Sequence, residues 1–309
     1  VQNGYIYLLK NIRQFYIRGG AGTGKTWIAM KMAELEAKKP NASVLFLCTS
    51  PHLATMVKTL ISDTIDVYDV VSLVNIVSKS PEMIELPKCE GIIDSLRHEI
   101  KKYDAIFIDE AQDFSEELAC LTKMLLKDEA LSRLGVFYDD VQVVRADSFG
   151  NAFMINTPPF LLHENIRNTS NIYSWTMERT NLGTDVIVNP VEGPWPVSEY
   201  INDSKHLLQR LEGLFKKFIE DEKLQCSSMV ILVEDADSFI NTFNGAIAKW
   251  KLIRNHLNND GEIMVSSVEE YKGLEADMIV YIRGMNASDN LNYIAYTRAR
   301  YYLLELIMK

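Results

Sequence analysis

Short apolar runs alternate along the chain with segments whose apolar residues recur at helical spacing, a pattern typical of strands alternating with helices. In the first half this pattern predicts buried strands over residues 15–17, 41–50, 66–71, 103–108 and 133–139. It predicts helices over residues 27–33 and 92–102, and helices that begin at Pro51 and near Ser115. Such alternation favours a parallel sheet, which binds ligands at the carboxyl ends of its strands.

The second half repeats this pattern after a break at Pro158 and Pro159. Strands are predicted over residues 160–162, 229–233, 263–268, 277–282 and 301–307, and helices over 168–179, 205–221 and 286–300. A chain of 309 residues is long enough for two domains. We therefore predict an α/β protein with domains at residues 1–158 and 159–309.

The most informative stretch lies between the first predicted strand and the first predicted helix. Its residues, Gly19, Gly20, Ala21, Gly22, Thr23, Gly24, Lys25 and Thr26, match the G-x-x-x-x-G-K-[ST] pattern of a phosphate-binding loop. Glycines let the backbone wrap closely around a polyphosphate, and the following helix turns its positive end toward it. Lys25 would then reach the β- and γ-phosphates, and the Thr26 hydroxyl would ligate Mg²⁺.

A second candidate site lies where the strand over residues 103–108 ends in acidic residues. In a protein with a phosphate-binding loop, Asp109 at this strand end would hold Mg²⁺, and Glu110 would orient and deprotonate the attacking water. Taken alone, such a cluster is equally typical of a cap for the helix that begins near Ser115. The loop at Gly19 favours the catalytic interpretation.

Composition narrows the possible partners and the compartment. The chain carries 32 basic and 42 acidic residues, a net charge of −10, and neither half is basic. Because nucleic-acid binding usually requires a basic surface, any such binding must use a local groove or be weak. No apolar run suits a membrane span and no signal peptide opens the chain, while Cys48, Cys89, Cys120 and Cys226 form no C-x-x-C pair. We therefore predict a cytoplasmic protein with reduced thiols.

Six segments, in order along nearly the whole chain, resemble the motifs of superfamily 1 helicases of the UvrD/Rep type. They are residues 19–26 for motif I, 109–113 for motif II, 139–142 for motif III, 165–169 for motif IV, 272–277 for motif V and 293–300 for motif VI. The amino-acid sequences of several of these motifs are most similar to those of short helicase-like ATPases that are often joined to a nuclease-related domain. The resemblance implies two RecA-like domains with ATP in the cleft between them.

The resemblance also assigns roles to residues outside the loop and the acid pair. It implies that Gln142 senses the γ-phosphate and that Arg167 and Arg298 act as arginine fingers. It implies nucleotide contacts at Gly273 and Glu275, with Glu275 on the ribose. Gln2 falls where the family's adenine-reading glutamine is expected, and Trp27 is either a stacking face for the base or a core residue.

The chain departs from the family at the positions that contact the nucleic-acid strand. Cys48 replaces a phenylalanine, residues 143–146 after Gln142 lack the aromatic side chains that stack on bases, and Ser267 and Glu269 replace a threonine and a histidine of motif V. At the nucleotide, Ile166 replaces the family's base-stacking tyrosine. Two functions therefore remain open. The first is a minimal Mg²⁺-dependent ATPase motor on DNA or other nucleic acid, within a nuclease-containing defence complex, such as an antiviral one, or a repair complex. The second is an ATP-driven switch that regulates a protein partner without unwinding.

Overall fold

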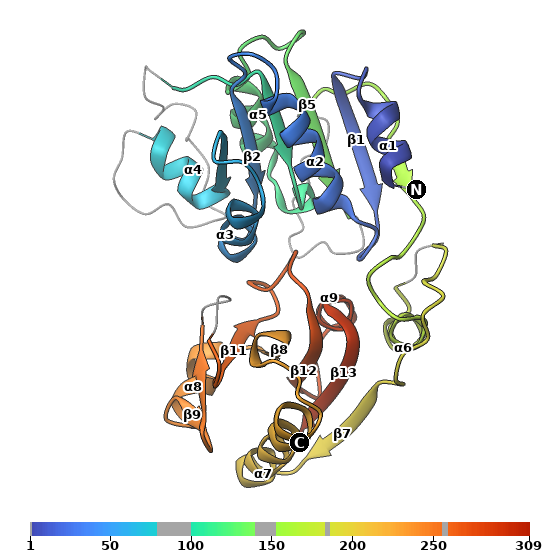
Figure 1. The fold of residues 1–309 in the computed structure, drawn as a ribbon, viewed down its shortest axis with the longest axis vertical. Coiled ribbons are helices and arrows are strands. Elements are labelled where there is room, and N and C mark those ends of the chain that lie inside the picture. The colour runs from blue at the N-terminus through green and yellow to red at the C-terminus, as the bar shows by residue number, and fades with distance from the viewer. Residues whose placement is uncertain (1, 79–99, 140–152, 183–185, 255–258) are drawn as a thin grey trace. The chain divides into compact units, whose positions relative to one another are not determined.

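The chain forms two compact units, Val1–Glu164 and Asn165–Lys309, each built around one β-sheet (Figure 1). The structure is a computed structural model that describes residues 2–78, 100–139, 153–182, 186–254 and 259–309. In this part of the chain, no helix combines the length and the apolar character that a membrane span requires. Cys48, Cys120 and Cys226 are free thiols, and Cys89 lies outside the described residues.

The first unit contains a six-stranded sheet in the order β3-β2-β4-β5-β1-β6, with every neighbouring pair parallel. The strands are β1 (Gln14–Gly19), β2 (Val44–Cys48), β3 (Ile65–Asp69), β4 (Ala105–Ile108), β5 (Arg133–Tyr138) and β6 (Phe160–Leu162). Every residue of β2 and β4 is buried. This is the burial expected for parallel strands that helices cover on both faces.

Helices connect the strands of the first unit and begin at caps that can be read in the sequence. They are α1 (Gln2–Leu9), α2 (Lys25–Ala37), α3 (Pro51–Leu60), α4 (Val70–Val77), a 3₁₀ turn at Ala111–Asp113 and α5 (Glu116–Met124). The side chains of Ser50, Asp69 and Ser115 each accept a hydrogen bond from a backbone N–H in the first turn that follows. Helix α2 packs across β2, β4 and β5, and this packing fixes the phosphate-loop sequence at the carboxyl ends of the strands.

The second unit contains a seven-stranded sheet in the order β7-β13-β12-β8-β11-β10-β9. The strands are β7 (Val197–Ile201), β8 (Met229–Val233), β9 (Ala246–Ile247), β10 (Trp250–Ile253), β11 (Glu262–Ser267), β12 (Ala276–Gly284) and β13 (Ala299–Met308). Of the neighbouring pairs, β9 and β10 are antiparallel and the others are parallel. Like the first unit, this one has the parallel α/β architecture predicted from the sequence.

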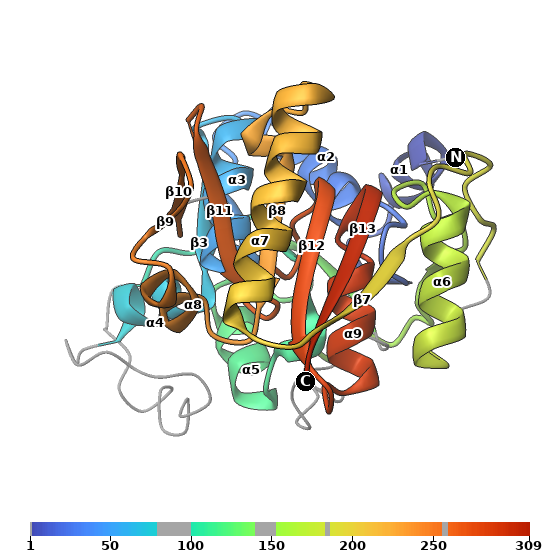
Figure 2. The same ribbon diagram turned by 90° about the horizontal axis from the view of Figure 1, so that it is seen from below.

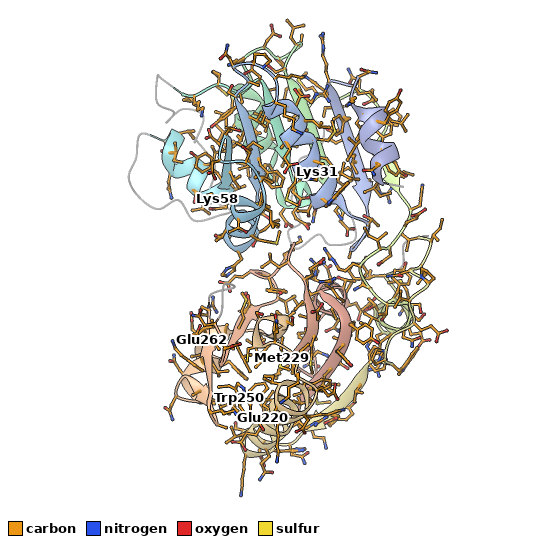
Figure 3. All side chains as sticks on the ribbon, viewed as in Figure 1. Lys31, Lys58, Glu220, Met229, Trp250 and Glu262 are labelled. Carbon is orange, nitrogen blue, oxygen red and sulfur yellow. The ribbon has the colours of Figure 1, made fainter. Side chains whose placement is uncertain are left out.

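Helices cover both faces of the second sheet, with α7 on one face and α9 on the other (Figure 2). The helices are α6 (Ser170–Thr180), α7 (Ser204–Phe215) with a π-helical turn at Lys216–Asp221, a 3₁₀ turn at Cys226–Ser228, α8 (Ala236–Thr242) and α9 (Asp289–Tyr296). Met229 and Trp250 lie in the buried core between the sheet and α7, where the Trp250 ring meets Phe215 edge-on at 5.3 Å (Figure 3). Glu220 and Glu262 are less buried and pair with Lys249 and Lys251.

Several predicted elements are wrong in extent or place. The predicted strand over residues 66–71 ends at Asp69, whose side chain caps α4. The helix α4 was not predicted. The predicted helix over 286–300 is shorter, because Thr297 ends α9 and β13 begins at Ala299. The strand at Phe160–Leu162 forms, but it pairs with β1 in the first sheet and so does not belong to the second half. The predicted helix over 92–102 lies almost entirely outside the described residues.

A buried carboxylate forms hydrogen bonds that join four elements of the second unit. Glu305 in β13 is completely buried and accepts hydrogen bonds from Ser198 Oγ at 2.6 Å, Arg283 Nε at 2.7 Å and the Tyr296 hydroxyl. Burial by itself raises the pKa of Glu305, but these hydrogen bonds and the Arg283 charge outweigh it, so the pKa lies below its usual range. The ionised form of Glu305 is therefore the one that the fold stabilises.

Replacing Glu305 with glutamine should destabilise the protein by about 3–5 kcal/mol at neutral pH, because Arg283 then loses the carboxylate that neutralises it. Since the pKa is lowered in the folded state, this contribution should be complete at neutral pH and lost as the pH falls through the folded-state value. Urea unfolding from pH 7 to pH 3 would measure both effects. Glu199→Gln, which breaks a half-exposed pair with Arg210, is the matched control and should cost less than about 1 kcal/mol. Equal losses for the two variants would contradict this account.

Candidate nucleotide-binding site

The phosphate-loop sequence forms a tight turn between β1 and α2. Gly19 ends β1 and Lys25 begins α2, while Gly22 and Gly24 have φ values of 75° and 90°, in the left-handed region that favours glycine. A Cβ atom on Gly19 would lie 2.5 Å from Thr23 Oγ1 and 2.9 Å from Leu162 Cβ. The sequence pattern therefore reflects backbone geometry that side chains at these positions would disrupt.

Lys25 lies inside this turn. Its ammonium donates hydrogen bonds to the carbonyl oxygens of Gly19 and Gly20 at 2.8 and 3.0 Å, and it lies 3.7 Å from the carboxylate of Asp139. The Lys25 side chain is 6% exposed, so its charge acts in a poorly solvated setting. A cation held this way at the start of a helix is suited to anionic phosphate oxygens.

Thr26 and Asp109 meet at the same edge of the sheet, although 83 positions separate them in the sequence. The Thr26 hydroxyl donates a hydrogen bond to Asp109 Oδ2 at 2.5 Å. The other carboxylate oxygen, Asp109 Oδ1, is buried and accepts no hydrogen bond from the described residues. A hydroxyl and a carboxylate with a spare buried oxygen are hard oxygen donors of the kind that Mg²⁺ prefers, so the residues present fit that ion.

The pKa of Asp109 is raised to about 7, first by burial and then by the nearby charge of Glu110. The Thr26 hydrogen bond and the Lys25 charge act in the opposite direction but do not cancel these effects. Two carboxyl groups on successive residues therefore lie where a cation would relieve their repulsion. This is the electrostatic setting expected for a site that takes a divalent cation together with an anionic ligand.

Glu110 is held in place by its own backbone and by Gln112. It has φ 55°, an uncommon left-handed conformation for a residue other than glycine, and it is 4% exposed. The Gln112 amide donates to Glu110 Oε2 at 2.5 Å, while its carbonyl oxygen accepts from the backbone N–H of Asp139 at 3.0 Å. Gln112 thus connects the ends of β4 and β5 and fixes the Glu110 carboxylate beside Asp109.

In the second unit, the predicted motif IV and motif V residues form a charged cluster. Arg167 Nε donates to Glu275 Oε2 at 2.5 Å, and Arg300 lies 3.7 Å from Glu275 and 3.3 Å from Asp277. Burial by itself raises the pKa of Glu275. The charge of Arg167 and its hydrogen bond, followed by the charges of Arg300 and Arg298, outweigh burial and lower this pKa below its usual range. Glu275 is therefore ionised, and Arg167 neutralises it.

Arg298 is the largest fully buried side chain among the described residues. Its guanidinium donates to the carbonyl oxygens of Ile294 at 3.1 Å and Leu274 at 3.3 Å, and to Thr297 Oγ1 at 3.2 Å. Its charge therefore lies beside the motif V segment that carries Gly273, which has φ 83°. Any action of Arg298 on a ligand requires some of these hydrogen bonds to be exchanged.

Asn168 joins the predicted motif IV segment to the beginning of β13. Its side-chain amide donates to the carbonyl oxygens of Thr297 and Ala299 at 3.1 and 2.6 Å, and its own oxygen accepts from Asn165 at 2.9 Å. The carbonyls flanking Arg298 are thereby held next to the loop that carries Arg167. This explains why residues so distant in sequence gather in one place.

The predicted site residues fall into two groups, one in each unit. The first unit brings together the whole loop from Gly19 to Thr26 with Asp109 and Glu110, and the second brings together Arg167, Gly273, Glu275 and Arg298. Gln142 lies outside the described residues. Trp27 is half-buried in the first turn of α2, and Gln2 is the first residue of α1.

Gln112 and Asp139 contribute to the first group, although from the sequence they were only placed in the motif II and motif III segments and neither was assigned a role. A signal for Asp139 was available, because it directly follows a buried strand at the ligand-binding edge of a parallel sheet. The motif II segment included Gln112, but its contact with Glu110 could not be predicted, since it depends on the left-handed turn at Glu110 that brings the Gln112 side chain back toward the strand ends.

The first unit carries a phosphate-loop sequence at the carboxyl ends of a parallel sheet, and a second parallel α/β unit follows it. A helicase family model matches most of the first unit. The family model described as "Schlafen group 3, DNA/RNA helicase domain" matches residues 13–170, just over half of the chain. The chain therefore belongs to this family. No curated protein matches the chain.

One of the similar solved structures supports the fold. A structure of Pif1 helicases at forked double-stranded DNA matches 98% of this chain and 90% of its own, with a TM-score of 0.54 and 12% identity. The PRRSV helicase matches with a TM-score of 0.48 and 13% identity, and the arterivirus nonstructural protein 10 helicase with 0.47 and 10%. These two matches cover 98% and 96% of this chain. The chain spans only 54% of the PRRSV helicase chain and 59% of the arterivirus chain. At such identities the Pif1 match shows a shared helicase fold and no more.

Proposed function

We propose that this protein hydrolyses ATP in a Mg²⁺-dependent reaction, as a minimal helicase-like motor that acts on nucleic acid. The observation that carries the proposal is the meeting of Lys25, Thr26 and Asp109 at one edge of the first sheet, with Glu110 beside them. Membership of a DNA/RNA helicase domain family supports nucleic acid as the partner. A nuclease-containing defence or repair complex remains our hypothesis for its setting.

The residues of the first unit divide the chemistry among them. The loop N–H groups and Lys25 bind the β- and γ-phosphates and withdraw negative charge from the transferring group. Thr26 and Asp109 would hold Mg²⁺, which when bound neutralises charge on the phosphate oxygens. Glu110, fixed by Gln112, orients a water molecule and accepts its proton as the water attacks the γ-phosphate.

The residues of the second unit complete the proposed reaction in roles that the motif resemblance suggests. Arg167 and Arg298 would supply positive charge to the γ-phosphate, and Glu275 would hold the ribose. Arg167 and Glu275 neutralise each other in this structure, and Arg298 is occupied by two carbonyls and a hydroxyl. We therefore infer that these side chains exchange partners when nucleotide binds.

A protein-regulating ATPase switch is the second candidate function, and specific observations favour it. Cys48, which replaces an aromatic residue of the family, is completely buried and cannot stack on a base. Glu269 is exposed just before the segment 272–277, where a carboxylate repels a phosphate backbone. Stacking contributes roughly 1–3 kcal/mol per base to single-strand binding, so its loss at these positions would weaken affinity substantially.

We expect nucleic acid to bind this chain mainly through phosphate contacts. Affinity for a short single strand should fall roughly 20-fold between about 50 and 200 mM salt if about three phosphates are contacted, because counterion release then drives binding. Fluorescence anisotropy with labelled DNA and RNA strands across a salt series would measure this, alongside ATP turnover with and without each strand. Stimulated turnover supports the motor. Turnover that no strand stimulates, together with undetectable binding, would favour the switch.

A further inference from the structure

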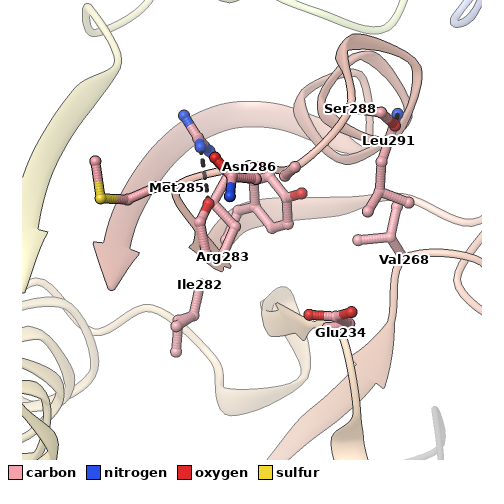
Figure 4. Close-up of a pocket in the computed structure, with 11 residues that line it drawn as sticks. Glu234, Val268, Ile282, Arg283, Met285, Asn286, Ser288 and Leu291 are labelled. Atoms are coloured by element: carbon pink, nitrogen blue, oxygen red, sulfur yellow. Dashed lines mark hydrogen bonds between the residues drawn. The ribbon is translucent and has the colours of Figure 1, made fainter. Parts of the chain in front are cut away.

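A cavity of about 380 Å³ lies at the carboxyl edge of the sheet in the second unit (Figure 4). Its walls come from the carboxyl-terminal end of β12, from the residues that follow β8, β11 and β12, and from the first turn of α9. The strands β12, β8 and β11 are adjacent and parallel. The lining residues that matter here are Glu234, Val268, Ile282, Asn286, Ser288 and Leu291. Ligands of parallel α/β sheets bind at this edge, so the position itself suits a binding site.

The cavity combines an apolar wall with one unneutralised carboxylate. Val268 and Ile282 are buried apolar side chains, and Glu234 is exposed at the end of β8, across the cavity from Asn286 (Figure 4). Within the described part of the chain, no side chain forms an ion pair or hydrogen bond with the Glu234 carboxylate. Arg283, the cation among the lining residues, is already paired with Glu305 at 2.7 Å and donates to the Gly284 carbonyl at 3.0 Å.

The surroundings of the cavity carry more negative charge. Asp235, Asp237, Glu269 and Asp289 are all exposed in the segments that follow the same strands. Arg254 supplies positive charge nearby, but it is bound by Glu270 at 2.6 Å and lies 3.7 Å from Asp237. A phosphate group would therefore meet repulsion here, whereas a cation would meet attraction.

We propose that this cavity binds an arginine side chain from a basic segment of a partner protein. The aliphatic stem of arginine would lie against Val268, Ile282 and Leu291, and its planar guanidinium would donate to the Glu234 carboxylate and the Asn286 side-chain oxygen. The acidic residues around the cavity would attract further basic residues of the same segment. This inference concerns protein binding and does not depend on ATP hydrolysis.

The test uses the full chain and a fluorescein-labelled (Gly-Ser-Arg)₄ peptide at near-physiological salt, with anisotropy as the readout. A peptide in which citrulline replaces every arginine keeps the shape and removes the charge, so it should bind far more weakly. Glu234→Gln should weaken binding of the arginine peptide at least about five-fold, the loss of roughly one charge-assisted contact. Asp237→Asn, which removes the same charge outside the cavity lining, should change it less than about two-fold.

Three outcomes would overturn the proposal. The first is equal weakening by Glu234→Gln and Asp237→Asn, which would show general attraction to an acidic surface and not a site. The second is undetectable binding of the arginine peptide to the wild-type chain. The third is binding of a single-stranded oligonucleotide that Glu234→Gln changes at least about five-fold, which would assign the cavity to nucleic acid. Circular dichroism of each variant would confirm that it remains folded.

Discussion

Replacing Lys25 with alanine is expected to reduce ATP turnover by about 10²–10³-fold and to weaken nucleotide binding as well. Lys25 is the cation inside the phosphate-loop turn, and its charge lies in a poorly solvated setting between two carbonyls and Asp139. Without it, the loop must bind a polyphosphate beside Asp109, Glu110 and Asp139 with no side-chain cation of its own. Phosphate release under saturating ATP and Mg²⁺ would measure the effect on kcat.

Lys31→Ala is the matched control for this variant. Lys31 lies in the same helix, is 43% exposed and pairs with Glu34 at 2.8 Å, so its loss should leave turnover within about two-fold. If Lys25→Ala retained turnover close to that of Lys31→Ala, the assignment of residues 19–26 as a phosphate-binding loop would be wrong.

Replacing Glu110 with glutamine should preserve ATP binding and lower turnover by about 10²–10⁴-fold, the range typical of a lost general base. The substitution keeps the size of the side chain, so the turn at Glu110 and the contact with Gln112 can remain. It also removes a neighbouring negative charge that raises the pKa of Asp109, which should favour the ionised form of Asp109. Binding of a fluorescent nucleotide and turnover should therefore respond in different ways.

Glu116→Gln is the control for Glu110→Gln. Glu116 is exposed in the first turn of α5, so this substitution makes the same chemical change away from the strand ends. A Glu110→Gln variant that turned over ATP as fast as Glu116→Gln would contradict the role proposed for Glu110. Loss of ATP binding in Glu110→Gln would instead assign this residue to ligand or cation binding.

The phosphate-loop sequence and the acid pair could be predicted because their geometry is local. Gly22 and Gly24 adopt φ values that glycine favours, and Asp109 follows a fully buried strand directly. Parallel pairing then brings Thr26 and Asp109 together without further information, because the loop and helix start that follow β1 lie at the same edge of the sheet as the end of β4. The fold class followed from the same alternation of strands and helices.

Features that depend on contacts between distant residues could not be predicted. The pairing of β6 with β1 joins residues more than a hundred positions apart, and nothing in the short sequence Phe160–Leu162 specifies its partner. The Arg167–Glu275 pair and the buried Glu305 network depend on side chains from several elements meeting in the folded unit. The α4 helix was missed because its first residues, Val70 and Val71, are β-branched and continue the apolar run of the strand predicted over residues 66–71.

The cavity beside Glu234 was also invisible in the sequence, since its walls come from three separate segments of the second unit. Its acidic surroundings could be noticed only once those segments were known to lie at one edge of the sheet. The net charge of −10 indicated that an extended basic surface was improbable, but it did not show where the acidic residues gather.

The most direct test of the central proposal is ATP turnover by the wild-type chain with Mg²⁺, measured beside Glu110→Gln and in the presence of excess EDTA. We predict measurable phosphate release by the wild type, higher release when single-stranded DNA or RNA is added, and loss of release with EDTA or Glu110→Gln. Wild-type protein that binds ATP yet releases no phosphate, with or without either strand, would contradict the account. So would release that Glu110→Gln leaves unchanged.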